Sequence, residues 1–204
     1  MSRLGLGTRR GFSLIELIMV IAIMLAVAAI AMPKFVTAVS DYRLKSSMAQ
    51  AAGMLQQQRM HAVRLNTTLQ LTTGLKDNGR TYGWVDLGGG TTAYAAPDPY
   101  VELPKSISVV SSGFPGDATS GLSYVAQNPS TAVIKFNARG LPCVGNGGAC
   151  LNVVTSAGGP QQVGFVVYFK NDKSFGVSGW GAITITPAGR IRSWFYNGSS
   201  YSPM

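Results

Sequence analysis

The apolar run FSLIELIMVIAIMLAVAAIAM, at residues 12–32, decides the architecture of this 204-residue chain. Its 21 residues include a single charge, Glu16, and a helix of that length is about 31 Å long, enough to span a bilayer. Arg3, Arg9 and Arg10 precede the run, with no acidic residue among them. Because positively charged flanks stay in the cytoplasm, we expect the chain beyond Lys34 to lie in the periplasm.

A cleaved secretory signal is the main alternative for this segment. Ala29-Ile30-Ala31 loosely fits a signal peptidase site placed after the apolar run, and a cut there would remove the helix. The string at residues 11–16 decides against this cleavage, because it resembles a processing site placed before the apolar run. An ordinary signal anchor is the other alternative, and the carboxylate of Glu16 argues against it, because a charge in hydrocarbon is costly unless it has a function there. The pattern therefore favours a membrane helix that the mature protein keeps.

The string Gly11-Phe12-Ser13-Leu14-Ile15-Glu16 resembles the processing site of type IV prepilins. In that family the leader ends in Gly, Phe usually follows, the fifth mature residue is Glu, and proline is common at the twenty-second. Glu16 and Pro33 stand at those two positions. The resemblance implies that prepilin peptidase removes the leader, residues 1–11, by cutting between Gly11 and Phe12, and that Phe12 becomes N-methylated.

Glu16 and Pro33 are therefore the candidate assembly residues. Cleavage gives Phe12 a free amine, which the Glu16 carboxylate of a neighbouring subunit can pair with as the helices pack together. Pro33 lacks an amide hydrogen and clashes with the preceding turn, which predicts a kink or local melting of the helix near the membrane surface. Other pilins and inner-membrane lipid are the expected partners of this segment.

Helical periodicity resumes after Pro33 and predicts an amphipathic stem over residues 34–66. The apolar stripe consists of Leu44, Met48, Ala51, Leu55, Ala62 and Leu65, and polar residues repeat on another face at Arg43, Gln50, Gln57 and Arg64. The stripe must be covered by the rest of the chain.

Strands and turns are predicted for the remainder. Strands are expected at 68–73, 81–87, 100–110, 131–137, 151–155, 162–169, 174–178, 181–186 and 189–196, with hairpin turns at 77–79 and 170–172 and long loops at 88–99 and 111–121. The expected fold is α+β and pilin-like, with a transmembrane helix 12–32, a stem 34–66, and a β-rich periplasmic domain 67–204 containing an antiparallel sheet.

Cys143 and Cys150 flank a glycine-rich loop and are expected to form a disulfide in an exported protein. A zinc site would need about four ligands, whereas the chain has one histidine, His61, in the stem. We therefore expect no metal, and no cofactor. No nucleophile elbow, paired base or phosphate loop is present either, so an enzyme is not expected.

The second half of the chain resembles the globular domain of the FimT/GspH family of minor pilins and pseudopilins. The resemblance rests on Phe136-Asn137-Ala138-Arg139-Gly140 and on Gly189-Arg190-Ile191-Arg192. It implies a minor pilin that primes or caps a type IV pilus. The alternative is an H-type pseudopilin of a type II protein secretion system, and an abundant major pilin fits less well.

A DNA-binding role is the most specific hypothesis for this domain. The chain carries a net charge of +9, which falls to +6 without the leader, and such a surface attracts polyanions. In a strand, Arg190, Arg192, Trp194 and Tyr196 share one face, so two guanidiniums would lie beside two aromatic rings. The resemblance implies that this arginine motif captures DNA in natural transformation. Alternatively, the arginines protect a sheet edge and Trp194 packs under a loop.

Overall fold

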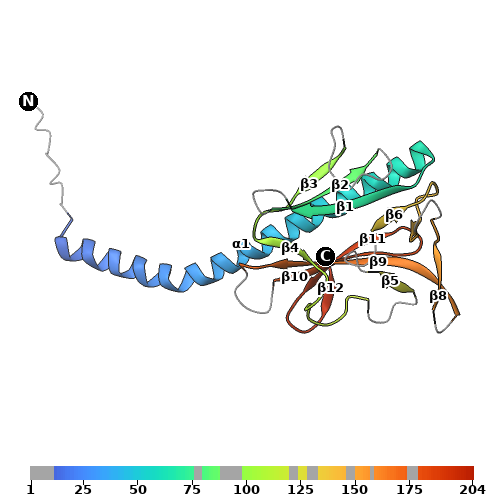
Figure 1. Ribbon diagram of the computed structural model, residues 1–204. Helices are drawn as coiled ribbons and strands as arrows, with labels where there is room; N and C mark the ends of the chain where they lie inside the picture. The colour runs from blue at the N-terminus through green and yellow to red at the C-terminus, as the bar shows by residue number, and fades with distance from the viewer. Residues whose placement is uncertain are drawn as a thin grey trace, which may run out of the picture. The chain divides into compact units, whose positions relative to one another are not determined.

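The computed structural model describes residues 12–75, 80–87, 98–119, 124–127, 133–145, 150–156, 159–173 and 179–204. The chain forms two compact units, Met1–Val39 and Ser40–Met204, and their boundary falls within one long helix, α1 (Figure 1). Gly11 and the rest of the leader lie outside the described residues, as do the predicted turn at 77–79 and the predicted strand at 174–178.

The helix α1 spans Leu14–Leu65 and ends in a Schellman motif. Asn66 adopts the left-handed conformation with φ of 49°, its N–H bonds to the carbonyl of Val63, and the N–H of Thr67 bonds to the carbonyl of Ala62. Asn is one of the few residues besides Gly that tolerates this conformation. The helix therefore stops one residue short of its predicted end.

Pro33 does not melt the helix, so of the two effects predicted for it only the kink stays a prediction. The structure carries α1 through Pro33 without interruption. Proline removes only one backbone hydrogen bond, and the preceding turns, residues 26–32, are rich in alanine, which favours a helix. On the following turn, the Thr37 hydroxyl donates to the Pro33 carbonyl at 3.1 Å.

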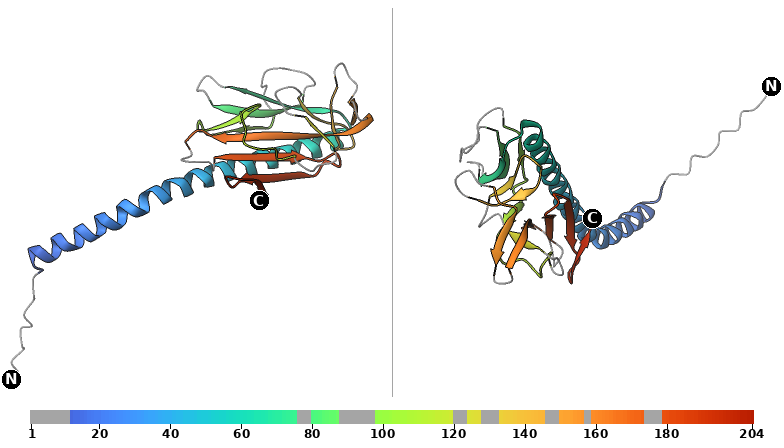
Figure 2. Two further views of the ribbon diagram at one scale, coloured as in Figure 1. Left: turned by 90° about the horizontal axis from the view of Figure 1, so that it is seen from below. Right: turned by 90° about the vertical axis from the view of Figure 1, so that its right-hand side faces the viewer.

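The described residues of the unit Ser40–Met204 form two β-sheets, seen in two further views in Figure 2. The first sheet is antiparallel, with strand order β3-β2-β1-β6-β7. Its strands are β1 (Leu69–Leu75), β2 (Thr81–Asp86), β3 (Tyr100–Glu102), β6 (Ile134–Phe136) and β7 (Pro142–Cys143).

The second sheet has the order β12-β11-β10-β9-β4 and is antiparallel along this path. The long strand β9 also pairs with β8, and in parallel with β5. The strands are β4 (Ile107–Val110), β5 (Val125–Gln127), β8 (Val153–Ser156), β9 (Gly159–Asn171), β10 (Trp180–Ile185), β11 (Ile191–Tyr196) and β12 (Tyr201–Pro203). These elements confirm the α+β, pilin-like fold.

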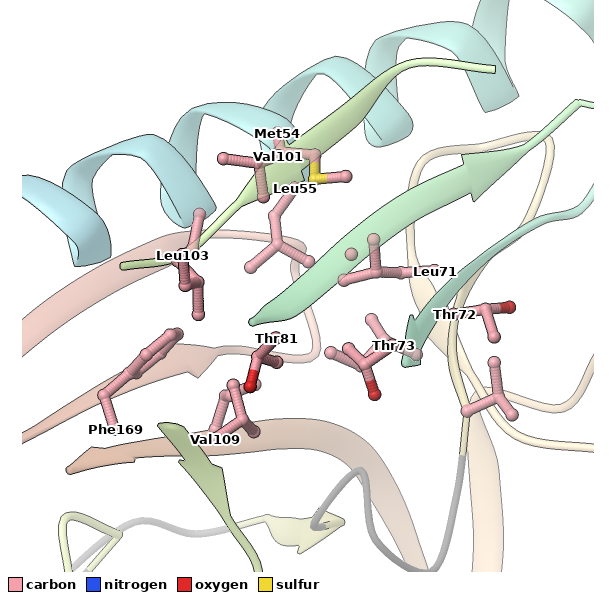
Figure 3. Close-up of a pocket in the computed structure, with 15 residues that line it drawn as sticks. Met54, Leu55, Leu71, Thr72, Thr73, Thr81, Val101, Leu103, Val109 and Phe169 are labelled. Carbon is pink, nitrogen blue, oxygen red and sulfur yellow. The ribbon is translucent and has the colours of Figure 1, made fainter. Parts of the chain in front are cut away.

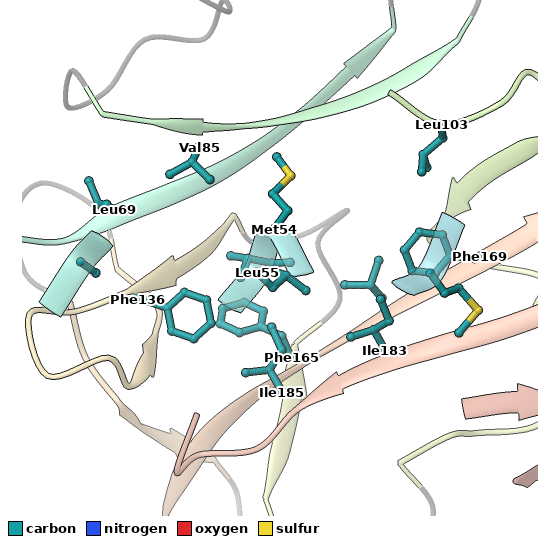
Figure 4. Close-up of a cluster of buried hydrophobic side chains, with 14 of the residues drawn as sticks. Met54, Leu55, Leu69, Val85, Leu103, Phe136, Phe165, Phe169, Ile183 and Ile185 are labelled. Carbon is teal, nitrogen blue, oxygen red and sulfur yellow. The ribbon is translucent and has the colours of Figure 1, made fainter. Parts of the chain in front are cut away.

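The main core lies between the stem part of α1 and both sheets (Figure 4). Leu55 of the helix packs with Phe136 of the first sheet and Phe165 of the second in one buried cluster. Gln58 adds a polar link, because its fully buried amide donates to the carbonyls of Leu69 and Ile134 at 2.9 and 3.2 Å. The helix thus contacts both sheets by burial, and Gln58 adds hydrogen bonds to two strands of the first sheet.

The predicted stripe on the stem is correct except at its end. Leu44, Met48, Leu55 and Ala62 are buried, and Ala51 is half-buried, but Leu65 is 51% exposed. The polar set Arg43, Gln50, Gln57 and Arg64 is exposed as expected. Leu65 is the last residue of the helix, one turn beyond the buried Ala62, where the chain leaves the core.

Candidate functional site

The N-terminal part of α1 carries the first candidate site. Among the described residues, α1 is the one helix that is long and apolar enough to cross a membrane. Glu16 lies in its first turn and is the only acidic residue there. Its N–H donates to the carbonyl of Ser13 at 3.1 Å. A carboxylate in a first turn also stabilises the helix by interacting with the helix dipole, independently of any subunit contact.

The β10–β11 hairpin presents the first arginine of the second candidate site. Its turn is closed by three hydrogen bonds. The N–H of Thr186 donates to the Arg190 carbonyl at 2.9 Å, the N–H of Gly189 to the Thr186 carbonyl at 2.7 Å, and the N–H of Arg190 to the Thr186 hydroxyl at 3.1 Å. Arg190 is exposed, directly before β11. The backbone under this guanidinium is therefore well defined.

The next residues alternate between the two faces of the second sheet, as expected. Ile191 and Phe195 pack against the main core on the inner face. Trp194 packs with a smaller cluster on the outer face, which includes Tyr168 and Ala182. Arg192 is exposed and lies opposite Thr184 of β10. Arg192 and Trp194 therefore share the outer face.

Trp194 is less available for stacking than the sequence suggests. Its ring is half-buried against the outer cluster, and its indole N–H donates to the Thr184 hydroxyl at 2.8 Å. Tyr196 is 8% exposed, and its hydroxyl donates to the Gly198 carbonyl at 3.1 Å. Both rings therefore belong partly to the sheet's own structure, although Trp194 keeps a partly exposed edge beside Arg192.

Tyr124 also belongs to this outer face, and sequence reasoning missed it. A side chain at Gly164 would collide with the Tyr124 ring, so glycine makes room for the tyrosine on β9. Burial raises the pKa of Tyr124, while the neighbouring Thr184 side chain and the Arg192 charge act in the opposite direction. Tyr124 precedes a strand of three residues in a polar segment, and no sequence pattern connects it with β11.

An acidic residue, Asp117, also lies at this outer face, because it is hydrogen-bonded to Tyr168 of the outer cluster. Asp117 accepts hydrogen bonds from the Thr119 hydroxyl at 2.6 Å and the Tyr168 hydroxyl at 3.0 Å. Partial burial disfavours its carboxylate, but these bonds outweigh that effect and lower the pKa of Asp117. Burial, with the nearby Tyr196 and Asp117 charges, raises the pKa of Tyr201 to about 12. Asp117 is thus committed to local hydrogen bonds.

Arg190 and Arg192 form no ion pair within the described part of the chain. The ion pairs found there join Arg80 to Glu102 at 3.3 Å and Lys170 to Asp172 at 3.1 Å. The second pair lies at the opposite end of the second sheet, since Lys170 pairs with Trp180 whereas Ile191 pairs with Ile185. Both arginines are exposed, and no carboxylate among the described residues pairs with their positive charge.

A cavity of about 190 Å³ lies between the helix and the two sheets (Figure 3). Met54 and Leu55 of α1, Leu103, and Phe169 of β9 contribute apolar walls, and the polar contributions come from threonines such as Thr81. The cavity is continuous with the hydrophobic core, and the described residues of its wall include threonine hydroxyls but no charged side chain.

Cys143 and Cys150 form the predicted disulfide. Their Cα atoms are 5.3 Å apart, and Cys143 is fully buried. Val144 and Leu151, each the residue after one of the cysteines, form an antiparallel bridge next to the bond, with backbone hydrogen bonds of 2.9 and 2.8 Å. Closing so short a loop stabilises the domain by about 2.5 kcal/mol in the chain-entropy picture. The bond anchors the chain that follows β7.

Comparison with known proteins identifies the N-terminal segment. Residues 7–32 match the family model described as the prokaryotic N-terminal methylation motif. The search of curated proteins and the search of solved structures each returned no significant match. The matched segment covers the predicted processing site and the apolar run, and so confirms the type IV pilin-like prepilin signal. It supports a type IV pilin-like protein that is processed by prepilin peptidase and anchored by its apolar helix.

Proposed function

We propose that this chain is a minor subunit of a type IV pilus, priming or capping the fibre. The observation that carries the proposal is the methylation motif at residues 7–32, followed by an apolar helix with Glu16 in its first turn. A separate unit with its own core, Ser40–Met204, follows that helix. This division suits a subunit whose helix enters the filament core while its β-rich part stays in water.

The orientation and processing belong to the same proposal. The leader, residues 1–11, stays cytoplasmic because of its three arginines, and the unit Ser40–Met204 faces the periplasm. Prepilin peptidase cuts between Gly11 and Phe12, and the new amine of Phe12 is methylated. Members of pilin-like families are structural subunits, so the expected product is a filament component.

The first prediction is that the mature protein begins at Phe12 and keeps its apolar helix. Mass spectrometry of the protein extracted from membranes should give the mass of residues 12–204 plus one methyl group. Cells that lack prepilin peptidase are the control, and there the leader should remain. An N-terminus after Ala31, or a leader retained despite active peptidase, would contradict the proposal.

In addition, we propose that this subunit binds DNA through Arg190 and Arg192. Both guanidiniums are exposed, and within the described residues neither forms an ion pair. Trp194 and Tyr124 lie on the same outer face as Arg192. Cations beside aromatic rings can hold phosphates and contact bases without reading a sequence. The expected ligand is duplex or single-stranded DNA, bound weakly and without sequence preference.

The second prediction concerns the salt dependence of this binding. Arg190→Gln with Arg192→Gln should flatten the slope of log affinity against log salt by up to about 2, because each duplex phosphate contact contributes about 0.9. The measurement is fluorescence anisotropy of labelled duplex DNA with full-length protein in nonionic detergent, over a range of salt concentrations.

A matched control removes the same charge at the other end of the second sheet. Lys105 and Lys173 flank the β4–β9 pairing there, and both are exposed. Lys105→Gln with Lys173→Gln should change the slope less than the arginine pair does. If the parent protein fails to bind at low salt, or both double variants bind alike, the DNA role is wrong.

A specific observation favours the alternative, an H-type pseudopilin of a type II secretion system. The indole N–H of Trp194 donates to the Thr184 hydroxyl, and its ring is half-buried. A ring held in this way is less able to stack on a base, which weakens the case for DNA binding. A pseudopilin would use this face for other pseudopilins or for exported proteins. Purification of the assembled filament distinguishes the two, since the subunit should be recovered with pilins in one case and with secretion components in the other.

A further inference from the structure

Arg59 of α1 joins two turns that are far apart in the sequence. Its Nε donates to the carbonyl of Gly140 at 3.0 Å, and its Nη1 donates to the carbonyl of Gly189 at 3.0 Å. Gly140 ends the turn between β6 and β7, and Gly189 lies in the turn between β10 and β11. The planar guanidinium suits this arrangement, because its donors have fixed directions. Arg59 therefore holds the two turns next to each other through hydrogen bonds to both.

Two glycines permit the close approach of these turns. Both are buried and both adopt left-handed backbone conformations, with φ of 72° at Gly140 and 76° at Gly189. A Cβ on Gly189 would lie 2.6 Å from the Gly140 carbonyl oxygen. Standard backbone dimensions then put the Cα atoms of the adjoining residues, Arg139 and Arg190, within about 14 Å of each other.

The β6–β7 turn holds Arg139 on an ordered backbone. The side-chain oxygen of Asn137 accepts hydrogen bonds from the N–H groups of Arg139 and Leu141, at 2.9 and 3.0 Å. The N–H of Gly140 donates to the Asn137 carbonyl at 2.8 Å. The Arg139 side chain is exposed, and within the described residues it forms no ion pair. It contributes positive charge without a visible structural function.

From this juxtaposition we propose that Arg139 is a third DNA-contacting arginine, acting together with Arg190 across the two turns. The proposal rests on the DNA-binding function inferred above and extends it to a residue 51 positions away in the sequence. Arg59 is a positioning residue, because its guanidinium donates hydrogen bonds to carbonyls of both turns and so holds the two turns together. The phosphate backbone is the recognised group, since guanidiniums on turns without a base-reading element neutralise phosphates rather than select bases.

The third prediction follows for Arg139 alone. Arg139→Gln should flatten the salt slope by about 0.9 and weaken binding to labelled duplex DNA at low salt. The measurement again uses full-length protein in nonionic detergent. Arg43→Gln is the matched control: Arg43 is an exposed arginine on the same unit, near the Ser40–Asn171 contact at the other end of the second sheet. It should leave the slope nearly unchanged, and Arg139→Lys should retain most of the parent slope.

The outcomes separate this inference from the DNA-binding proposal itself. If Arg190→Gln with Arg192→Gln flattens the slope but Arg139→Gln does not, DNA binding stands and the third contact is wrong. If the parent protein binds no DNA, both the DNA-binding function and the contact by Arg139 are wrong. Because the exposed Arg139 side chain forms no ion pair with the described residues, Arg139→Gln should unfold at the same urea concentration as the parent. A large loss of stability would assign Arg139 a structural role and overturn the proposal.

A double-mutant cycle tests the positioning role of Arg59. In the parent background, Arg139→Gln should flatten the slope by about 0.9, whereas in an Arg59→Met background the same change should have little further effect. A purely structural role of Arg59 would lower stability without altering the effect of Arg139→Gln. Equal effects of Arg139→Gln in the two backgrounds would therefore refute positioning by Arg59.

Discussion

Replacing Glu16 with Val should leave processing and membrane insertion intact but remove the subunit from filaments. The apolar side chain is more stable in the bilayer than a carboxylate, so membrane insertion should become more favourable. Filament assembly should become less favourable, because the Phe12 amine of a neighbouring subunit is left without its partner. Breaking a buried ion pair costs about 3–5 kcal/mol. Since about 1.4 kcal/mol is a factor of ten, we expect the fraction recovered in sheared filaments to fall on the order of a hundredfold.

Two further substitutions show whether the charge of Glu16 is responsible. Glu16→Gln keeps the shape and polarity but loses the charge, and it should fail in assembly as Glu16→Val does. Leu17→Val changes an adjoining apolar residue of the same turn and should assemble normally. Both the membrane fraction and the sheared fraction are measured by immunoblot. Normal recovery of Glu16→Val in filaments would refute the pairing and leave Glu16 as a helix-dipole residue.

The sequence was sufficient to predict the features that arise from local chemistry. The run at residues 12–32 dictates a helix because its apolar content is unbroken, and the alternation of Ile191, Arg192 and Phe195 follows from the period of a strand. The Cys143–Cys150 bond was predictable because the loop between the two cysteines is short and rich in glycine. These predictions required no knowledge of distant partners.

The strand bounds were less predictable, since hydrogen-bonding partners determine them. The single strand expected at 100–110 is divided into β3 and β4, because a turn interrupts it. The N–H of Ile107 closes that turn by donating to the carbonyl of Pro104. β9 extends to 13 residues, well beyond the predicted 162–169, because four other strands pair along it. The short strands β5, β7 and β12 lack a periodic pattern and were missed.

The composition of the candidate site depends on contacts that no local pattern reveals. Arg59 reads in the sequence as one more polar stem residue, yet its donors reach carbonyls 81 and 130 positions away. Tyr124 lies beside Arg192 only because Gly164 leaves room on β9. The sequence therefore identifies Arg190 and Arg192, while the fold supplies the neighbours that would make a site of them.

The largest stability effect is expected for Gly189→Ala, which should lower the free energy of unfolding by about 3 kcal/mol or more. A left-handed conformation costs a non-glycine residue about 1–2 kcal/mol. The added Cβ would also lie 2.6 Å from the Gly140 carbonyl oxygen and 2.9 Å from Arg59 Nε. The Gly140 carbonyl oxygen is a backbone atom held by the hydrogen bond from Arg59, so it cannot move away as the end of a side chain could. Inserting an extra carbon into a filled space typically costs about 1–3 kcal/mol more. Urea unfolding followed by tryptophan fluorescence measures the change.

Gly113→Ala separates the two causes of this loss. Gly113 has nearly the same φ, 73° against 76° at Gly189, but a Cβ there would meet no atom within 4 Å. Its substitution should therefore cost only the conformational part, about 1–2 kcal/mol. The difference between the two variants measures how tightly the β6–β7 and β10–β11 turns are held against each other. If Gly189→Ala costs no more than Gly113→Ala, the two turns are free to separate, and Arg139 and Arg190 no longer form one surface.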